Sequence, residues 1–584
     1  MGVPAFFASL IKNALVSILR KSEEVGAIDC LYFDLNCLIH PQCFKILDKN
    51  VNITNFDILE GKMIDYVIEY INHVIRFVSP KKYVYFSVDG TAPLAKISQQ
   101  RKRRFDSSNN YKTEIMKKYN IPYSSWSNVV ITPGTEFMER LHLKLVEYYS
   151  NPLDDYPNLE ILYSSYHIPG EGEHKILQDM KIRYADNKES NIAIYGLDAD
   201  LLFLSMASNI KNIFLVREDS TYSHNTNTND KNNLYIFESL TYVDMDSTIN
   251  EINKMIRKEI DICIRENNSS LKVNCESFID DYILFCFLLG NDFLPHFYSL
   301  DIKRGGMEIA VKSYVKAFTR NKGLKIIERN ENGDIKINTK VFIDYISIIA
   351  CGENDFFKYK LHKNINNERI RKRCYEKEEW KKEIWKIENL INIKENDQMK
   401  LGIGDETTWN YNYYKVIGAE GKLQKDLKKD MCMNYIEGIM WVFNYYFKEC
   451  SDYTWQYNFH YSPLMKDLNE FLHDIPNFDM NKIIFEKKKS IPIFVQLLAV
   501  LPTTFNKYLP SSYKFLTTDF DSPIIDLFPT KYKIDFTYQT QRFKCPQLIP
   551  FVDIKRLLLS TNKLKLTNEE KIRSKQDIKY IKLN

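Results

Sequence analysis

Short apolar runs alternate with helical patterns through the first half of the chain. Four of these runs are mostly apolar or aromatic, and each is followed by a polar or glycine-containing turn: 30–33, 83–88, 160–163 and 192–195. Runs of this length between such turns are typical of buried strands. Strands that alternate with helices predict an α/β fold in which a largely parallel central sheet is flanked by helices.

The second half has a different pattern, which divides the chain. Residues 223–233 are polar, and we interpret them as an exposed loop within the first half. Residues 371–400 are dense in Lys, Arg and Glu, which is typical of a solvated amphipathic helix or a linker. The aromatic-rich remainder has a mixed periodicity. We therefore predict four parts: a first domain at 1–350, a charged helical linker at 351–404, a second mixed, helix-rich domain at 405–560 and a basic C-terminal tail at 561–584.

Composition limits the class of protein. A chain of 584 residues can bury a large core and predicts two or more domains. No apolar run approaches the roughly 20 residues needed to cross a bilayer. Residues 1–19 lack the basic start of a signal peptide, so we expect an intracellular protein without a membrane segment. The 11 cysteines form no C-x-x-C pair, which disfavours disulfides and structural zinc. The formal charge of +4 indicates that any nucleic-acid-binding surface is local.

Aspartates follow three of the predicted strands. The first two strands run into Asp34 and Asp89, and the fourth runs into Asp198 and Asp200. In open α/β sheets the ligand crevice lies at the carboxyl ends of the strands, so these side chains can converge. Taken singly, each aspartate is as readily explained as a helix cap or a turn residue.

Three further carboxylates extend this set. Glu171 and Glu173 lie where a glycine-containing turn enters a helix, and Asp292 follows the apolar helix predicted at 278–289. Seven clustered carboxylates repel one another unless cations compensate them. Magnesium prefers oxygen ligands, and two ions about 4 Å apart can activate a water and stabilise the leaving oxygen of a phosphodiester. The set as a whole therefore favours a nuclease site.

A basic helix is predicted downstream of Asp89, beginning near Pro93. Its side chains at helical spacing would form an anion pocket suited to a terminal phosphate. The four residues concerned are Lys96, Gln100, Arg103 and Arg104. The alternatives are a solvated charged helix or a nuclear localisation signal at 101–104. Proximity to a strand-end carboxylate favours the phosphate pocket.

Motifs along the chain resemble one known family. MGVPAFF, YFDLNCLIH, VDGTAPLAKISQQRKRRF, TPGTEFM, PGEGEHKI, YGLDADLLFL and LGNDFLP occur in order, and YIEGIMWVFNYYF, LAVLP and SPIIDLFP follow. Together they resemble the Xrn family of 5′→3′ exoribonucleases. GLDAD alone would also fit flap endonucleases, whereas QQRKRRF and PGEGEHK together are specific to Xrn enzymes.

The resemblance implies a fold, an activity and a set of site residues. The fold would be a core like that of PIN domains and flap nucleases, joined to a helix-rich second domain. The activity would be processive hydrolysis of single-stranded RNA with a 5′-monophosphate to nucleoside 5′-monophosphates, in the turnover of decapped transcripts. Two Mg²⁺ ions, replaceable by Mn²⁺, would be held by the seven catalytic carboxylates Asp34, Asp89, Glu171, Glu173, Asp198, Asp200 and Asp292. The 5′-phosphate would be held by Lys96, Gln100, Arg103 and Arg104. His40 and Trp455 would sandwich the leading bases, because stacking is tolerant of sequence.

Several points stay open in the sequence. Trp455 is equally explained as a core tryptophan, His40 as a polar residue near a strand end, and Asn36 and Asn291 as turn residues or supports of neighbouring aspartates. The chain ends at Asn584, where cytoplasmic family members continue into a long extension, so the resemblance implies a short form. We expect a monomer in the cytoplasm rather than the nucleus. The alternative functions are a structure-specific 5′ nuclease acting on DNA and an inactive RNA-binding scaffold, although all seven carboxylates are present.

Overall fold

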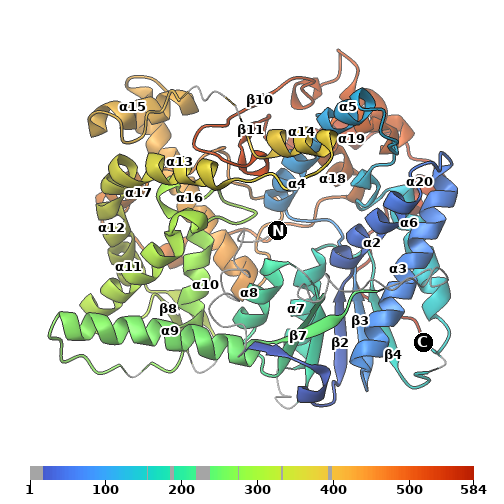
Figure 1. Cartoon of the computed structure of the whole chain (residues 1–584), viewed down its shortest axis with the longest axis horizontal. Helices are drawn as coiled ribbons and strands as arrows, with labels where there is room; N and C mark the ends of the chain where they lie inside the picture. Colours follow the sequence, from blue (N-terminus) through green and yellow to red (C-terminus); the bar gives the residue numbers. More distant parts are fainter. Residues whose placement is uncertain are drawn as a thin grey trace.

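A central β-sheet organises the first half of the protein (Figure 1). The computed structural model describes residues 18–153, 155–184, 190–196, 198–218, 237–273, 275–330, 333–391, 393 and 397–584. Within these residues the sheet has the strand order β1-β7-β6-β5-β2-β3-β4-β12. The strands are β1 (Leu19–Arg20), β2 (Cys30–Asp34), β3 (Tyr83–Ser87), β4 (Glu160–Ser164), β5 (Ile192–Tyr195), β6 (Ile213–Glu218), β7 (Leu240–Asp244) and β12 (Ile581–Lys582). The predicted loop at 223–233 lies outside the described residues.

The four predicted strands are confirmed as the middle of this sheet. β4, β3, β2, β5 and β6 are parallel, whereas β7, β1 and β12 are antiparallel to their neighbours. All residues of β2, β3 and β5 are buried. Burial on both faces explains why these strands read as continuous apolar runs rather than as alternating patterns.

Two hydrophobic cores cover the two faces of the sheet. Leu31, Phe33 and Phe86 face α2 (Leu35–Lys49), α3 (Phe56–Val78) and α6 (Glu136–Tyr149). Tyr32 and Ile194 belong to the other core, with α7 (Gly172–Arg183), α8 (Ala199–Ala207) and α10 (Ile279–Leu288). Successive side chains of a strand point to opposite faces, so both cores come from the same short runs. The predicted α/β fold with a mostly parallel sheet is therefore confirmed.

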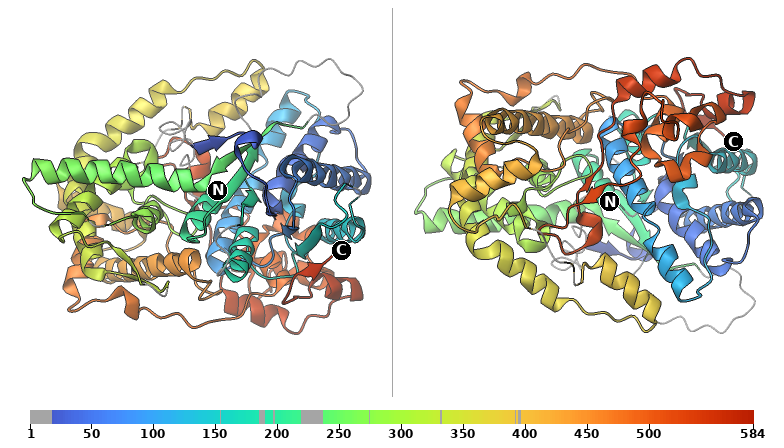
Figure 2. Two further views of the ribbon diagram at one scale, coloured as in Figure 1. Left: turned by 90° about the horizontal axis from the view of Figure 1, so that it is seen from below. Right: turned by 90° about the horizontal axis from the view of Figure 1, so that it is seen from above.

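A helical region packs against the second of these faces. It contains α9 (Met245–Glu266), α11 (Gly306–Arg320), α12 (Thr339–Asp355), α16 (Leu423–Phe447) and α17 (Met465–Asp474). Their apolar residues belong to the same core as α7 and α8, and α9 extends along one edge of the molecule (Figure 2). The division at residue 350 stays a prediction; α12 runs across this position. None of the helices in the described part of the chain is both long and apolar enough to span a bilayer.

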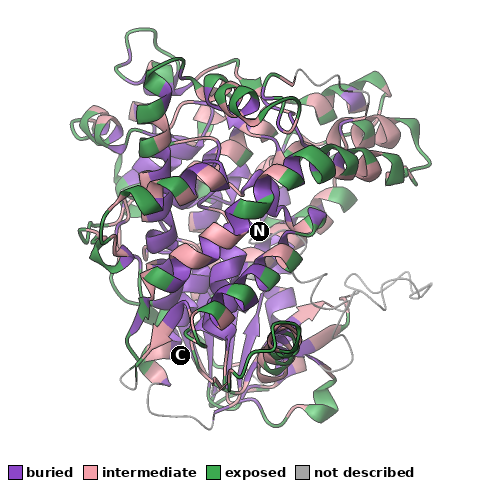
Figure 3. Cartoon of the chain, turned by 90° about the vertical axis from the view of Figure 1, so that its left-hand side faces the viewer, coloured by how far each residue is buried: buried purple, intermediate pink, exposed green. Residues whose placement is uncertain are grey.

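The charged linker and the C-terminal tail both contact the rest of the protein. The linker includes α13 (His362–Arg371) and α14 (Glu379–Glu388), and α14 buries no residue. Lys118 of α5 (Tyr111–Lys118) forms an ion pair of 2.8 Å with Glu383 in α14. The tail contains α20 (Asn568–Arg573) and then β12, which pairs with β4 at the sheet edge. Buried positions gather in the sheet and the helices around it, and exposed ones on the outer helix faces (Figure 3).

Candidate active site

The carboxyl ends of β2 and β3 place two aspartates around one glycine. Asp34 ends β2, opposite Ser87 in the parallel register, and Asp89 lies two residues beyond Ser87. The amide of Gly172, the first residue of α7, donates a hydrogen bond of 2.7 Å to Asp89 Oδ1. A Cβ atom on Gly172 would lie 2.9 Å from Asp34 Oδ1 and 3.4 Å from Asp89 Oδ1. A glycine is therefore needed where the two aspartates approach the start of α7.

The remaining predicted carboxylates gather at the same edge. Glu171 precedes α7 and Glu173 lies in its first turn, while Asp198 caps α8 and accepts a hydrogen bond from the amide of Asp200. The Lys96 ammonium joins this set, because its Nζ lies 2.6 Å from Glu171 Oε2 and 2.9 Å from Asp292 Oδ2. We call Asp34, Asp89, Glu171, Glu173, Asp200 and Asp292 the carboxylate cluster. Asp198 adjoins the cluster through its hydrogen bond with the amide of Asp200.

The carboxylate cluster carries more negative charge than Lys96 can balance. Burial and the Asp200 charge raise the pKa of Glu173 well above its ordinary value. Burial and Asp89 raise the pKa of Asp34 to about 7, and burial and Asp292 raise that of Asp200. Asp34 Oδ1 is buried without a hydrogen-bond partner. These carboxylate oxygens are close together and buried away from water, so a divalent cation would stabilise their negative charge. Carboxylates are hard oxygen donors, which Mg²⁺ prefers.

Lys96 balances part of this charge from within. Burial lowers its pKa, but Asp292 and Glu171 outweigh that effect and hold the pKa well above its ordinary value. Among the described residues, no three His, Cys, Asp or Glu side chains already form a group that could hold an ion. The structure thus places Lys96, predicted for the phosphate pocket, in contact with the carboxylates.

The other predicted phosphate ligands lie further along the same helix. α4 (Leu94–Ser107) begins directly after Pro93. Arg103 is exposed, and Arg104 donates to Thr132 at 3.3 Å. Burial and the Arg103 charge lower the pKa of Arg104 to about 10, so two guanidinium groups are close together. Gln100 is half-buried on this helix.

One residue of the basic run has a structural role. Arg101 is 2% exposed and donates to the carbonyl of Ala499 at 2.6 Å and to the carbonyl of Leu527. A buried arginine bound to two carbonyls anchors α4 to the second half of the protein. The run at 101–104 is therefore neither a fully solvated helix face nor a freely presented basic peptide.

The two predicted stacking residues have different surroundings. Burial, together with the charges of Arg104 and Arg103, lowers the pKa of His40 to about 3, so a neutral imidazole lies beside the arginines. Trp455 stacks on Trp441, with ring centroids 5.4 Å apart and planes at 21°. In the described part of the chain, no ring contact joins His40 to Trp455. The structure thus brings His40 to the phosphate residues, and the stacking role of Trp455 stays a prediction.

Helix α16 supplies two tyrosines that the sequence did not single out. Tyr445 Oη donates a hydrogen bond of 2.6 Å to Glu171 Oε1, and Tyr446 is hydrogen-bonded to Asp200. The ring of Tyr445 stacks between His174, at 4.4 Å and 11°, and Trp441, at 5.1 Å and 14°. Their only signal in the sequence is the paired tyrosine at the end of YIEGIMWVFNYYF.

Neighbouring polar residues hold the site in place. Asn36 Oδ1 accepts from the amide of Asp89 at 2.9 Å, so Asn36 supports this aspartate. Asn291 instead accepts from the amides of Phe293 and Leu294, which is a turn role. Lys175 is buried and donates to two carbonyls; burial lowers its pKa to about 7.

Comparison with known proteins identifies a family and several relatives with similar sequences. A family model described as "XRN 5′-3′ exonuclease N-terminus" matches residues 1–219, and one described as "Xrn1 helical domain" matches residues 272–393 and 381–584. The human protein named 5′-3′ exoribonuclease 1 is 29% identical over 98% of this chain and 35% of its own length. Its Schizosaccharomyces pombe namesake is 26% identical over 98% of this chain and 49% of its own length. Arabidopsis thaliana 5′-3′ exoribonuclease 2 is 26% identical, with 98% and 68% covered.

The matches extend over both halves of the chain, which spans 35% and 49% of the length of the first two relatives. The helical-domain model alone covers more than half of the 584 residues. The chain therefore belongs to the Xrn family of 5′→3′ exoribonucleases.

Proposed function

We propose that this chain hydrolyses single-stranded RNA from a 5′-monophosphate end and releases nucleoside 5′-monophosphates. The observation that carries the proposal is the buried carboxylate cluster, which lies beside the basic helix α4 and is joined to it by Lys96. An acidic site for divalent cations next to a site for a terminal phosphate is what an end-directed nuclease needs. Relatives named 5′-3′ exoribonuclease support the direction of degradation and the RNA substrate in this proposal.

The carboxylates would hold two Mg²⁺ ions, for which Mn²⁺ could substitute. The candidate ligands are Asp34, Asp89, Glu171, Glu173, Asp198, Asp200 and Asp292. When bound, such a pair of ions activates a water and stabilises charge on the departing oxygen. Tyr445 and Tyr446 would orient Glu171 and Asp200 by the hydrogen bonds described above.

The basic face of α4 would select the end of the RNA. Gln100, Arg103 and Arg104 would hold the terminal phosphate, because guanidinium groups match phosphate oxygens in geometry and charge. Lys96 would connect this pocket to the carboxylates. His40 is neutral beside the arginines, so its ring could stack on the leading base without repelling them. Trp455 would stack on a following base.

We further propose that the protein acts as a monomer in the cytoplasm, on decapped transcripts. These points rest on the family resemblance.

The test compares products from uniformly labelled single-stranded RNA with a 5′-monophosphate or a 5′-triphosphate, in Mg²⁺, for the native protein and Asp200→Ala. We expect mononucleotides from the monophosphate RNA alone, and none from Asp200→Ala. Equal cleavage of both RNAs would contradict the phosphate pocket. Cleavage of a flap DNA but not of RNA would support a DNA nuclease, and no cleavage by the native protein would support an RNA-binding scaffold.

A further inference from the structure

A cavity lies beside the carboxylate cluster. It is a cavity of about 730 Å³, within the size range of small-molecule sites. Its wall includes Asp292 of the cluster and Arg103 of α4, so it adjoins both parts of the candidate active site. Its other walls come from residues 294–302, 460–462 and 539–547.

The cavity faces a different side of α4 from the predicted phosphate pocket. Consecutive residues of an α-helix are about 100° apart around its axis. Gln99, Lys102 and Asp106 therefore share one side and line the cavity, whereas Gln100 and Arg104 point to the adjacent side and do not line it. Arg103 lies between the two sides. A ligand in the cavity would thus be a neighbour of the terminal phosphate rather than an occupant of the same position.

One end of the cavity carries positive charge without a matching anion. Asp106 is paired with Arg542 at 2.9 Å, and Asp292 lies 2.9 Å from Lys96, which it shares with Glu171. Within the described residues, neither Lys102 nor Arg103 has an ion-pair partner. Burial lowers the pKa of Lys102 to about 8. An anionic group bound here would compensate two cations, and phosphate is the anion proposed above for the adjacent side of this helix.

The other end offers amide groups and an aromatic ring. Gln539 and Gln547 are 2% and 7% exposed, and the Oε1 atom of each is buried without a hydrogen-bond partner. Unpaired buried acceptors are rare in proteins and indicate a missing donor. Phe543, in contrast, is 64% exposed. Amide groups can pair with the edge of a nucleobase and an exposed ring can stack on its face.

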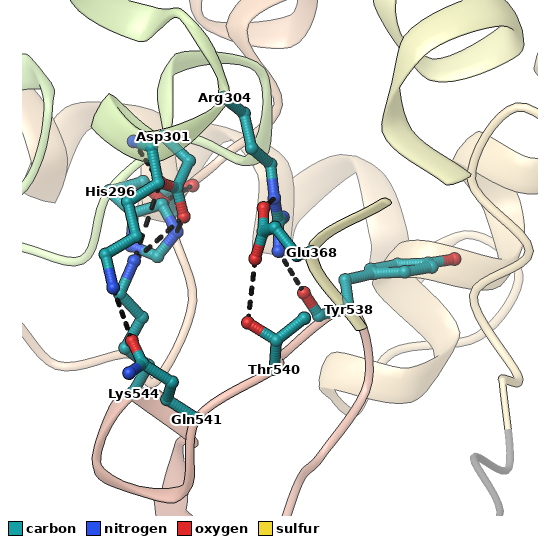
Figure 4. Close-up of polar contacts among 10 residues, drawn as sticks. His296, Asp301, Arg304, Glu368, Tyr538, Thr540, Gln541 and Lys544 are labelled. Atoms are coloured by element: carbon teal, nitrogen blue, oxygen red, sulfur yellow. Dashed lines mark hydrogen bonds and ion pairs between the residues drawn. The ribbon is translucent and has the colours of Figure 1, made fainter. Parts of the chain in front are cut away.

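The wall that carries these residues is firmly held (Figure 4). Lys544 Nζ lies 3.1 Å from Asp301 Oδ2, and Lys303 donates to Gln541 at 2.6 Å. Arg304 donates to Glu368 at 2.9 Å and to the carbonyl of Tyr538 at 2.8 Å. These bonds on both sides of Phe543 fix residues 538–544 to the helical region. This side of the cavity is therefore formed by a segment that hydrogen bonds and ion pairs hold in place.

We propose that this cavity binds a nucleoside 5′-monophosphate, with its phosphate at Lys102 and Arg103 and its base at Phe543, Gln539 and Gln547. The proposed function supplies such a molecule as its product, and in that respect the inference rests on it. The product would pass from the carboxylate cluster to the cavity past Asp292 and would be held there before release. High concentrations of mononucleotide would then slow multiple turnover.

The direct test is calorimetric titration of the full chain with adenosine 5′-monophosphate in EDTA. Phe543→Ala removes an exposed ring, and Lys102→Met removes one cation; neither residue belongs to the proposed catalytic set. We expect each variant to weaken binding by about tenfold. Lys117→Met, an exposed lysine of α5 that does not line the cavity, should bind as the native protein does. Gln547→Leu provides a further probe, with its thermal melting point measured alongside.

The outcomes separate this inference from the proposed function. Unchanged affinity in Phe543→Ala and Lys102→Met would overturn the assignment, and so would inorganic phosphate binding as tightly as the nucleotide. If the native protein degrades RNA, adenosine 5′-monophosphate should slow its multiple-turnover rate more than that of Phe543→Ala. The single-turnover rates of the two proteins should be equal. A protein that binds the nucleotide through these residues but leaves RNA intact would contradict the proposed function alone.

Discussion

Two buried groups of charge border the same cavity, and the pKa values of their acids are shifted in opposite directions. In the carboxylate cluster, burial raises the pKa of Asp34, Glu173 and Asp200, and the neighbouring acids raise it further. In the wall of the cavity, burial also acts to raise the pKa of Asp301, but His296, Lys544 and Arg304 outweigh it and lower the pKa. Burial is similar in the two places, and the local balance of charge differs.

This difference separates a site that needs a ligand from a part of the fold that does not. Asp301 has Lys544 beside it and Arg304 has Glu368, so the wall is neutralised by its own residues. The carboxylate cluster shares Lys96 among several acids and leaves Asp34 Oδ1 without a donor. A surplus of buried charge at the end of a sheet is costly to folding and is maintained where function requires it.

The largest expected effect comes from removing one acid of the cluster. Asp200→Asn keeps the shape of the side chain and removes a charge, so cleavage of 5′-monophosphate RNA should fall by about 10³-fold or more, as for groups that stabilise a transition state. The metal-free variant should melt no lower than the native protein, because a repulsive charge is gone. Single-turnover assays and thermal melting measure the two effects. Asp261→Asn, on the exposed side of α9, is the control.

Replacing Asp301, an acid that is ion-paired in the wall of the cavity, by Asn should instead destabilise the protein. Asp301→Asn leaves Lys544 buried without its anion, and breaking a buried pair in this way destabilises a protein by about 3 kcal/mol. We expect a lower urea midpoint, and Mg²⁺ should not restore the difference from the native protein. Asp474→Asn at the exposed end of α17 serves as the control. A stability equal to that of the native protein would show that the network does not hold the wall.

The contrast also explains what the sequence could predict. Four strands could be predicted because burial on both faces makes them short continuous apolar runs: 30–33, 83–88, 160–163 and 192–195. The convergence of the aspartates that follow three of these strands could be predicted because a parallel sheet gathers the carboxyl ends of its strands at one edge. The docking of β12 onto β4 was not predicted, since its two residues carry no periodic signal.

Contacts between distant segments account for the rest. Tyr445 reaches Glu171 from 274 positions along the chain, and Arg101 binds carbonyls in the second half. Nothing local distinguishes these side chains from an ordinary core tyrosine or a surface arginine. Lys96 was predicted to bind a phosphate, and its ion pairs with Glu171 and Asp292 were not foreseen, because helical spacing does not reveal which neighbour an ammonium group meets.

A pH series sharpens the comparison further. The pKa of folded Asp34, about 7, lies above its ordinary value of 3.8. The native protein therefore binds a proton more tightly than the unfolded chain, and this group lowers stability as pH rises between these values. Asp301 has a lowered pKa, so it contributes stability above its ordinary pKa and loses it as pH falls. In EDTA, Asp34→Asn should gain about 1–2 kcal/mol relative to the native protein between pH 5 and pH 7. Asp301→Asn should show no such gain in urea unfolding.

The smallest expected effect comes from the hydrogen bond that α16 contributes to the cluster. Tyr445→Phe keeps the ring stacked between His174 and Trp441 and removes the donor to Glu171. Partners that orient a metal ligand typically contribute about 10- to 100-fold to metal affinity or activity, and we expect the lower end because Lys96 also holds Glu171. The concentration of Mg²⁺ for half-maximal stabilisation in thermal melting should therefore rise about tenfold, with the maximal rate nearly restored at saturating Mg²⁺. The control is Tyr435→Phe, which also changes a tyrosine of α16 but removes a hydroxyl that donates to the carbonyl of Pro295. The Mg²⁺ dependence of this variant should match that of the native protein. An unchanged requirement in Tyr445→Phe would mean that the cluster is oriented by Lys96 and the sheet alone.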